Sequence, residues 1–191
     1  DLLDGLRFTH PVSLVGLSTG GPITAAYTAR FPERVSKLVL IDPIGAKALP
    51  FAPALKVAAL PFVGEGIASL VRADGISGKI ATFYNRELVE EFRSRYMVQT
   101  QYKGFRQAIL STIRSHTLDA CPEVYERIGK MDKPVLLFWG RKDPTVPFRH
   151  SHVLRAAMPN MEFHVIENCG HIPHHEKPDK VNPILLEFLK S

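Results

Sequence analysis

Four short runs of mostly apolar residues constrain the fold of this chain more than any other feature. They lie at residues 11–15, 35–41, 134–139 and 161–166 of the 191 residues. Helical patterns follow at residues 22–30, 148–158 and 180–189. Nearly continuous apolar strands are typical of parallel sheets, which are buried on both faces, and strands that alternate with helices favour a sheet with helices on both sides. The sequence therefore predicts an α/β fold with three layers, α/β/α, around a mostly parallel sheet.

Residues 44–130 differ in character from the rest of the chain. Gly, Pro and Ala alternate here with helical patterns, of which the clearest cover residues 85–97, with Asn85 as a suitable cap, and 104–116. We therefore predict a helical cap, or lid, inserted into a core that consists of residues 1–43 and 131–191. The insertion follows the second strand at its carboxyl end, where parallel sheets bind ligands.

Apolar side chains are frequent in the first half of the predicted cap. They are Leu49, Phe51, Leu55, Leu60, Phe62, Val63, Ile67 and Leu70. For any one of them, packing on the core is the more frequent role. Together they indicate a small-molecule substrate with an apolar part, whose individual binding residues the sequence does not identify.

A glycine-rich turn joins the first strand to the first helix. It reads Gly16-Leu17-Ser18-Thr19-Gly20, a G-x-S-x-G pattern. In this context the two glycines allow a sharp turn that lifts the Ser18 hydroxyl above the edge of the sheet. The backbone N–H of Thr19, at the start of the helix, can point at a developing oxyanion. Ser18 is therefore a candidate nucleophile and Thr19 a candidate oxyanion-hole residue. The alternative for Ser18 is an ordinary serine in a glycine turn.

A serine hydroxyl needs a general base, and the base needs a carboxylate that orients it. Asp143 follows the third strand in W-G-R-K-D-P, and His171 follows the fourth in N-C-G-H-I-P. The order Ser, Asp, His is the one expected of a nucleophile elbow in an α/β sheet. Asp42, which ends the second strand, is an alternative acid. The structural alternatives are a turn aspartate at Asp143 and a loop histidine at His171.

Three histidines and a glutamate close to one another suggest a metal site at first sight. They are His171, His174, His175 and Glu176. Metal ligands spaced at i and i+4 need a helix to align them, and Pro173 argues against a helix here. We therefore expect no metal and no cofactor.

The remaining histidines and cysteines are expected to be structural. His150 and His152 lie two apart on an expected helix and face different directions, which indicates surface positions. Cys169 is expected to be a small packed residue rather than a second nucleophile. Cys121 and Cys169 are the only cysteines, which fits free thiols in a reducing compartment such as the cytoplasm, although one bridge is also compatible.

The charge and hydropathy of the chain bear on whether it binds nucleic acid or spans a membrane. The chain carries 24 Lys and Arg against 19 Asp and Glu, a formal net charge of +5, but its basic residues are scattered and form no run of five. This distribution indicates a solvated surface rather than a nucleic-acid site. No apolar run approaches the roughly 18 residues that a membrane helix needs. We therefore expect neither a nucleic-acid partner nor a membrane span.

Taken together, these segments resemble the α/β-hydrolase fold superfamily over the whole chain. They are the V-G-L-S-T-G-G elbow, the L-V-L-I-D-P strand, the helical cap, the G-R-K-D-P-T-V-P acid loop and G-H-I-P-H-H-E-K-P. Among its subfamilies, the chain is most similar to capped serine esterases and to carbon–carbon bond hydrolases that act on meta-cleavage products. Haloalkane dehalogenases and epoxide hydrolases share the cap but carry an aspartate at the position of Ser18. The resemblance implies Ser18 as nucleophile, His171 as general base, Asp143 as its partner and the Thr19 amide as half of the oxyanion hole.

The first residues of this sequence resemble a part of the family's fold that lies after its first strands. Family members have roughly four further strands before the elbow, and their loops include a His-Gly segment that supplies the second oxyanion donor. Asp1 resembles a position in the helix that leads into the elbow strand, so we expect the chain to be the carboxyl-terminal two thirds of a family domain. Residues 12–15 would then form an apolar sheet edge through which the chain can self-associate.

The residues and the resemblance together predict a serine hydrolase that cleaves an ester or related acyl bond through an acyl-enzyme. The alternatives among enzymes are carbon–carbon bond hydrolysis of the meta-cleavage type and a cofactor-free haloperoxidase or perhydrolase, whose S-T-G-G elbow is similar. A non-catalytic ligand-binding module and an inactive fragment of an active parent are the alternatives without catalysis.

Overall fold

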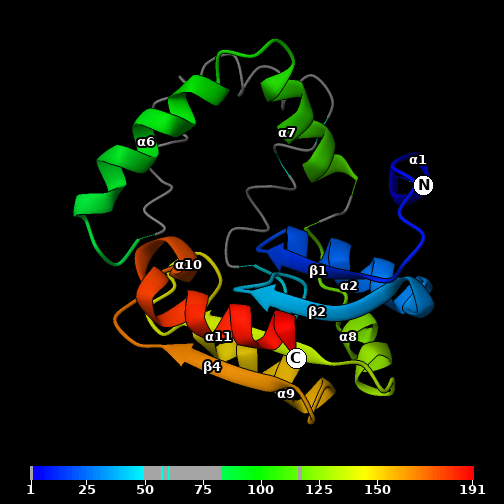
Figure 1. Ribbon diagram of the computed structural model, residues 1–191. Helices are drawn as coiled ribbons and strands as arrows, with labels where there is room; N and C mark the ends of the chain where they lie inside the picture. Colours follow the sequence, from blue (N-terminus) through cyan, green and yellow to red (C-terminus); the bar gives the residue numbers. More distant parts are fainter. Residues whose placement is uncertain (1, 50–56, 58–59, 61–82, 116–117) are drawn as a thin grey trace.

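A four-stranded parallel sheet forms the centre of the protein (Figure 1). The computed structural model describes residues 2–49, 57, 60, 83–115 and 118–191. The strands are β1 (Val12–Leu17), β2 (Val35–Ile41), β3 (Val135–Gly140) and β4 (Glu162–Ile166). They lie in sequence order, and every pairing between neighbours is parallel. The strands therefore match the predicted segments, and their carboxyl ends meet at one edge.

Helices cover both faces of this sheet. The helices of the described residues are α1 (Leu2–Gly5), α2 (Gly20–Arg30), α6 (Glu87–Gln99), α7 (Phe105–Arg114), α8 (Pro122–Gly129), α9 (Ser151–Ala157), α10 (Pro173–Glu176) and α11 (Pro178–Lys190), with 3-10 turns at Pro32–Arg34 and Phe148–His150. Residues of α2, α8 and α9 share one core cluster with the sheet, and residues of α11 share the other. This arrangement confirms the predicted three-layer α/β/α fold.

Successive residues of β2 contribute to the two clusters alternately. Leu38 and Leu40 are buried with α2, α8 and α9, whereas Val39 and Ile41 are buried with Val181 of α11. Side chains of a strand point to opposite faces in turn, and here both faces are covered by helices. Both sets must therefore be apolar, which explains the continuous apolar run in the sequence.

Helix α8 is packed as part of the core, although it lies within residues 44–130. Tyr125 and Ile128 are buried in the same cluster as α2 and α9, and the Tyr125 hydroxyl donates a 2.6 Å hydrogen bond to the backbone oxygen of Ile44. Burial raises the pKa of the Tyr125 hydroxyl, which keeps it protonated as a donor. The division into a core of residues 1–43 and 131–191 and a cap of residues 44–130 stays a prediction.

Helices α6 and α7 stand above the sheet in Figure 1 and contact each other through aromatic rings. The rings of Tyr96 in α6 and Phe105 in α7 lie 5.9 Å apart, edge to face, and Phe92 stacks on Tyr96. The amide oxygen of Asn85 accepts a 3.0 Å hydrogen bond from the backbone N–H of Glu87. The cap position of α6 is Arg86, so the prediction of Asn85 as the cap is wrong by one residue, and Asn85 instead holds the turn just before the cap.

Only two of the residues predicted to line a pocket lie in the described part of the chain. Leu49 is buried in the core cluster with Tyr125, and Leu60 is 51% exposed. The others lie outside the described residues: Phe51, Leu55, Phe62, Val63, Ile67 and Leu70. The apolar substrate pocket therefore stays a prediction.

Strand β1 lies at one edge of the described sheet, and Val15 on this strand is 47% exposed. Self-association through this edge stays a prediction. Within the described residues, the helices are all too short or too polar to cross a membrane.

Candidate active site

Ser18 occupies a strained turn directly after β1. Its φ of +51° is a left-handed value that is uncommon for a residue with a Cβ. Backbone hydrogen bonds hold the turn: the N–H of Ser18 donates to Ile41, and the oxygen of Ser18 accepts from Gly21 at 3.0 Å and from Ile44 at 3.2 Å. Strain of this kind persists only where the surroundings enforce it, and it is concentrated at functional sites. The conformation matches the strand-to-helix elbow that the sequence predicts.

The two glycines of this turn have different roles. A Cβ on Gly16 would collide with Oγ1 of Thr24 and would lie 2.5 Å from the backbone oxygen of Gly20, whereas a Cβ on Gly20 would meet nothing within 4 Å. Neither glycine has a positive φ, because Ser18 itself is the left-handed residue of the turn. The sharp turn therefore depends on Gly16, which lets the end of β1 pass close to the start of α2.

Thr19 lies at the cap position of α2. Its backbone N–H donates no hydrogen bond to any described residue. The start of a helix carries a partial positive charge, and a free N–H there suits an anionic oxygen. This geometry is compatible with the predicted place of Thr19 in an oxyanion hole.

Asp143 and His171 form a buried hydrogen-bonded pair. Nδ1 of His171 lies 2.7 Å from Oδ2 of Asp143, and their side chains are 6% and 0% exposed. The other carboxylate oxygen, Oδ1, accepts from the backbone N–H groups of Thr145 at 2.7 Å and Val146 at 2.9 Å. The carboxylate is thus fixed by its own loop. Because it accepts the proton on Nδ1 of His171, Nε2 of the neutral ring carries no proton and can act as a base.

The strand order brings these groups to one edge of the sheet. Ser18 follows β1, Asp143 follows β3 and His171 follows β4. Among the described residues, the hydroxyl of Ser18 makes no hydrogen bond with the ring of His171. Hydrogen bonds between nucleophile and base often form only in the substrate complex. The structure therefore contains the buried Asp143–His171 hydrogen bond, and the catalytic roles of these residues and proton transfer from Ser18 stay predictions.

Asp42, the alternative acid, is buried beside this pair. It directly follows β2, has a φ of +41°, and its Oδ1 accepts a 2.9 Å hydrogen bond from the backbone N–H of Gly140. Burial, and secondly the neighbouring Asp143 carboxylate, raise the pKa of Asp42 well above its ordinary value. His171 is hydrogen-bonded to Asp143 and not to Asp42, which favours Asp143 as its partner.

Pro173 begins a short helix, which corrects one premise of the expectation that no metal binds here. Pro173 was expected to prevent a helix, but it begins α10, where the first helical position tolerates proline because no N–H is needed there. Glu176 is nevertheless directed at backbone N–H groups rather than at the histidines. In the described part of the chain, three potential ligand atoms come within 4.8 Å of one another only at Asp42, Asp143 and His171.

Glu176 connects the loop that carries His171 to the start of α6. One carboxylate oxygen accepts from the backbone N–H of Gly170 at 2.7 Å and of Tyr84 at 3.2 Å, and the other accepts from the N–H of Asn85. The side chain is buried. The sequence indicates Glu176 only as a possible metal ligand. It does not reveal the connecting role, because Tyr84 and Asn85 lie about 90 residues away along the chain.

We expect Glu176→Ala to lower the free energy of unfolding by about 2 kcal/mol, because buried N–H groups lose their acceptor. Urea denaturation measures this change. Glu187→Ala, on the exposed side of α11, is the control and should change the free energy by less than about 0.5 kcal/mol. Equal stability of the two variants would contradict the connecting role of Glu176.

His150 is buried, which corrects the predicted surface position. It is 3% exposed, and its Nδ1 has no hydrogen-bond partner among the described residues. The expected helix is replaced at this point by the 3-10 turn Phe148–His150, which sets the orientation of the ring before α9 begins. His152, two residues further along the chain, is exposed as predicted.

The burial of His150 predicts a loss of stability in acid. Desolvation, and then the charges of Arg149 and Lys47, lower the pKa of His150 below the value of about 6.5 expected in the unfolded chain. The folded state then binds fewer protons, so the free energy of unfolding falls as the pH drops below about 6.5. We expect His150→Gln to make this decline shallower and His152→Gln to leave it unchanged in urea denaturation at several pH values. Identical slopes for wild type and His150→Gln would contradict this prediction.

Both cysteines are free thiols. Cys169 is fully buried, and burial, followed by the charge of Glu176, raises its pKa well above the ordinary value for a thiol. A thiol that stays protonated is a poor nucleophile. This confirms the interpretation of Cys169 as a packed residue.

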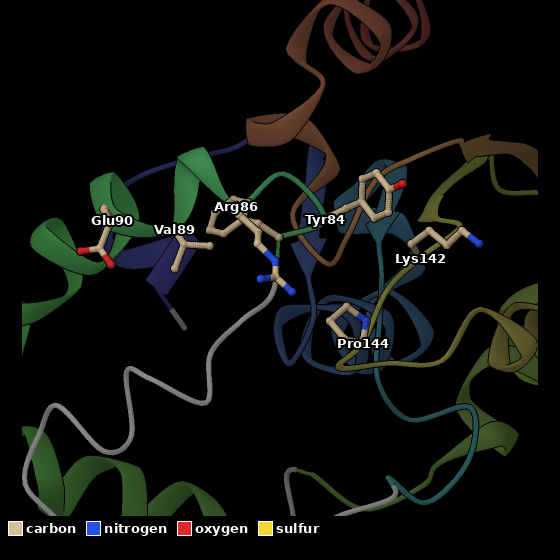
Figure 2. A pocket seen from close by; sticks show the side chains of 7 residues that line it. Tyr84, Arg86, Val89, Glu90, Lys142 and Pro144 are labelled. Atoms are coloured by element: carbon tan, nitrogen blue, oxygen red, sulfur yellow. The ribbon is translucent and has the colours of Figure 1, made fainter.

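A pocket of about 520 Å³ lies beside the acid loop (Figure 2). It is lined by Phe83, Tyr84, Arg86, Val89, Glu90, Lys142 and Pro144. Lys142 and Pro144 flank Asp143, and the other residues belong to the start of α6 and the segment before it. Ser18, Thr19, Asp143 and His171 are not among the described residues that line this pocket, which is therefore a neighbour of the candidate site.

Curated relatives and solved structures resemble the chain along its length. 2-Hydroxy-6-oxononadienedioate/2-hydroxy-6-oxononatrienedioate hydrolase 1 of Pseudomonas putida is 29% identical over 187 residues, 93% of this chain and 62% of the relative. The structure of 2-hydroxy-6-oxo-6-phenylhexa-2,4-dienoate hydrolase from Rhodococcus sp. strain RHA1 has a TM-score of 0.76 and 25% identity over 100% of this chain and 67% of that chain. An esterase from Thermogutta terrifontis has a TM-score of 0.76 and 21% identity, covering 99% and 68%, and shows likeness of fold alone.

The chain spans about three fifths of the length of the curated relatives it matches. A family model described as alpha/beta hydrolase fold matches residues 1–178. This match agrees with the parallel sheet and the strained turn at Ser18. The chain belongs to the alpha/beta hydrolase fold family.

Proposed function

We propose that the protein is a serine hydrolase in which Ser18, His171 and Asp143 form a catalytic triad. The observation that carries this proposal is the buried 2.7 Å hydrogen bond between His171 and Asp143, at the same sheet edge as the strained turn of Ser18. A histidine held in this way by a carboxylate is the arrangement that a serine nucleophile requires.

The proposed reaction proceeds in two steps. Oγ of Ser18 attacks the carbonyl carbon of an ester while Nε2 of His171 accepts its proton, and the N–H of Thr19 donates to the developing oxyanion. The intermediate collapses to an acyl-enzyme, and the leaving alcohol takes the proton from His171. Water then attacks the acyl carbon, His171 accepts a proton from this water, and the proton returns to Ser18 as the acid leaves. No step needs a metal or cofactor.

An ester with an apolar part is the first substrate class that we propose, because apolar residues are frequent in the predicted cap. We place the enzyme in a reducing compartment, the cytoplasm, on the strength of its free thiols.

A second candidate is hydrolysis of a carbon–carbon bond, which the names of the curated relatives favour. These relatives are hydrolases of 2-hydroxy-6-oxo-dienoates, compounds that contain a ketone and no ester. Water would then add across the bond beside the 6-oxo carbonyl, which yields a carboxylic acid from the ketone side and a C–H bond on the other fragment. The same elbow would serve both reactions, because each has a carbonyl carbon as its centre.

A competition assay separates the candidates. Hydrolysis of a p-nitrophenyl ester is measured alone and in the presence of 2-hydroxy-6-oxo-6-phenylhexa-2,4-dienoate, whose own loss is followed by its absorbance. Turnover of the ester with weak inhibition by the dienoate supports an esterase, and turnover of the dienoate supports the second candidate. A peroxide-dependent halogenation assay tests the predicted haloperoxidase alternative. Binding of these compounds without turnover would contradict the proposal and support a non-catalytic binding module.

A further inference from the structure

We propose that Asp42 carries a proton in the folded protein and donates it in a hydrogen bond to the carboxylate of Asp143, as a positioning residue of the acid–base pair. This inference rests on the proposed function for its consequence in catalysis. The proton on Asp42 itself is a property of the fold and can be tested separately.

The backbone holds Asp42 firmly at this place. Its N–H donates a 3.1 Å hydrogen bond to the oxygen of Phe138, and its Oδ1 accepts the N–H of Gly140, so both ends of the residue are tied to β3. The φ of +41° is one that Asp and Asn tolerate better than most other residues. Asp42 is 0% exposed, so neither oxygen contacts bulk solvent.

The second oxygen of Asp42 is the unusual feature. Oδ2 is buried and has no hydrogen-bond partner among the described residues. An ionised Asp42 would therefore be an unpaired buried charge, which is far more costly than an unpaired neutral group. A proton on Oδ2 removes this charge and turns the orphaned oxygen into a donor.

The charges around Asp42 agree with this assignment. Asp143 and His171 face it, with ligand atoms of all three residues within 4.8 Å of one another. Glu176 of α10 adds a further negative charge, and Cys169 is a neighbouring thiol that also stays protonated. Asp143, Glu176 and Cys169 all disfavour a negative charge on Asp42. Only a protonated His171 would favour it.

Asp143 is the acceptor for this proton. Its carboxylate already receives three donors, from Thr145, Val146 and His171, which identifies it as the ionised member of the two acids. A carboxylate has about four lone-pair sites, so one site remains. The neighbouring Asp143 also raises the pKa of Asp42, as expected of a carboxylate that accepts this proton.

A metal ion fits this cluster less well than a proton. Two ligands that hold one zinc ion at about 2 Å each lie more than about 3 Å apart. Nδ1 of His171 and Oδ2 of Asp143 are only 2.7 Å apart, which is the separation of a charge-assisted hydrogen bond.

Asp42→Asn is the decisive variant, because its side-chain oxygen can accept from Gly140 while its NH₂ donates to Asp143. Infrared spectra at neutral pH should show a protonated-carboxyl band in the wild type that is lost in Asp42→Asn. The control Asp179→Asn, at an exposed position of α11, should keep the band. A wild-type spectrum without this band would overturn the proposal.

Stability gives a second readout that does not depend on catalysis. The folded state keeps the Asp42 proton above the pH of about 4 at which the unfolded chain loses it. The equilibrium constant for unfolding of the wild type, divided by that of Asp42→Asn, should therefore rise about tenfold per pH unit above pH 4, until the folded protein releases the proton. A ratio that stays constant between pH 4 and 7 would contradict the proposal.

The positioning role is measured by the rate at which a fluorophosphonate labels the chain. We expect Asp42→Asn to react within about threefold of the wild type, and Asp42→Ala and Asp143→Asn to react at least about tenfold more slowly. If Asp42→Asn is as slow as Asp143→Asn, Asp42 acts as an ionised acid and the positioning role is wrong. If the wild type does not react at all, the proposed function fails, and the infrared band and the unfolding curves still decide whether Asp42 carries the proton.

Discussion

Ser18→Ala should reduce ester hydrolysis by about four to six orders of magnitude, while the protein remains folded. Loss of the nucleophile in a serine triad removes the covalent route and leaves only binding and oxyanion stabilisation. The change is an exchange of one small side chain for another on a half-buried turn, so the free energy of unfolding should change little. Initial rates with a p-nitrophenyl ester and urea denaturation of the same preparation measure both quantities.

Ser13→Ala is the matched control for this experiment. Ser13 lies on β1, the strand that leads into the turn of Ser18, is exposed and shares a 3.0 Å hydrogen bond with Ser36 rather than contacting the acid–base pair. Its variant should retain wild-type rates within about twofold. Residual activity of Ser18→Ala equal to that of Ser13→Ala would mean that another group carries the reaction.

Gly16→Ala should destabilise the protein by about 3 kcal/mol and abolish its reaction with a fluorophosphonate. The added methyl group would occupy the space of Thr24 Oγ1 and of the Gly20 backbone, and the backbone cannot yield without moving Ser18. Gly20→Ala, in the same motif, should change stability by less than about 1 kcal/mol, because its Cβ enters open space. Urea denaturation and labelling rates of the two variants give the comparison.

The difference in stability between Gly16→Ala and Gly20→Ala is the most specific part of this prediction. The G-x-S-x-G motif by itself suggests that both glycines are equally necessary. The structure shows that a Cβ has no room at Gly16 but open space at Gly20. Equal stability of Gly16→Ala and Gly20→Ala would contradict the close packing of β1 against the start of α2.

The sequence predicts the sheet well because its strands are buried on both faces. A run such as residues 35–41 can satisfy both core clusters only if nearly all its residues are apolar, and such runs are visible without a structure. The place of Ser18, Asp143 and His171 follows from the same fact, because parallel strands in sequence order bring their carboxyl ends together. The catalytic roles of these residues stay a prediction.

Features that depend on distant pairings could not be read from the sequence. The hydrogen bond from Gly140 to Asp42 joins residues 98 positions apart and follows from the register of β2 on β3, in which Ile41 lies opposite Phe138. His150 was misplaced because helical periodicity does not reveal the 3-10 turn that precedes α9. Pro173 was misjudged because a proline blocks a helix only beyond its first turn.

The most direct test of the central claim is the intact mass of the chain before and after treatment with a fluorophosphonate, followed by mapping of the modified residue. Such probes react with serines that a neighbouring base activates. We predict a single adduct on Ser18 in the wild type and in Ser13→Ala, and no adduct in Ser18→Ala or His171→Ala. An unmodified wild-type chain, or an adduct at another residue, would contradict the claim that Ser18, His171 and Asp143 act together.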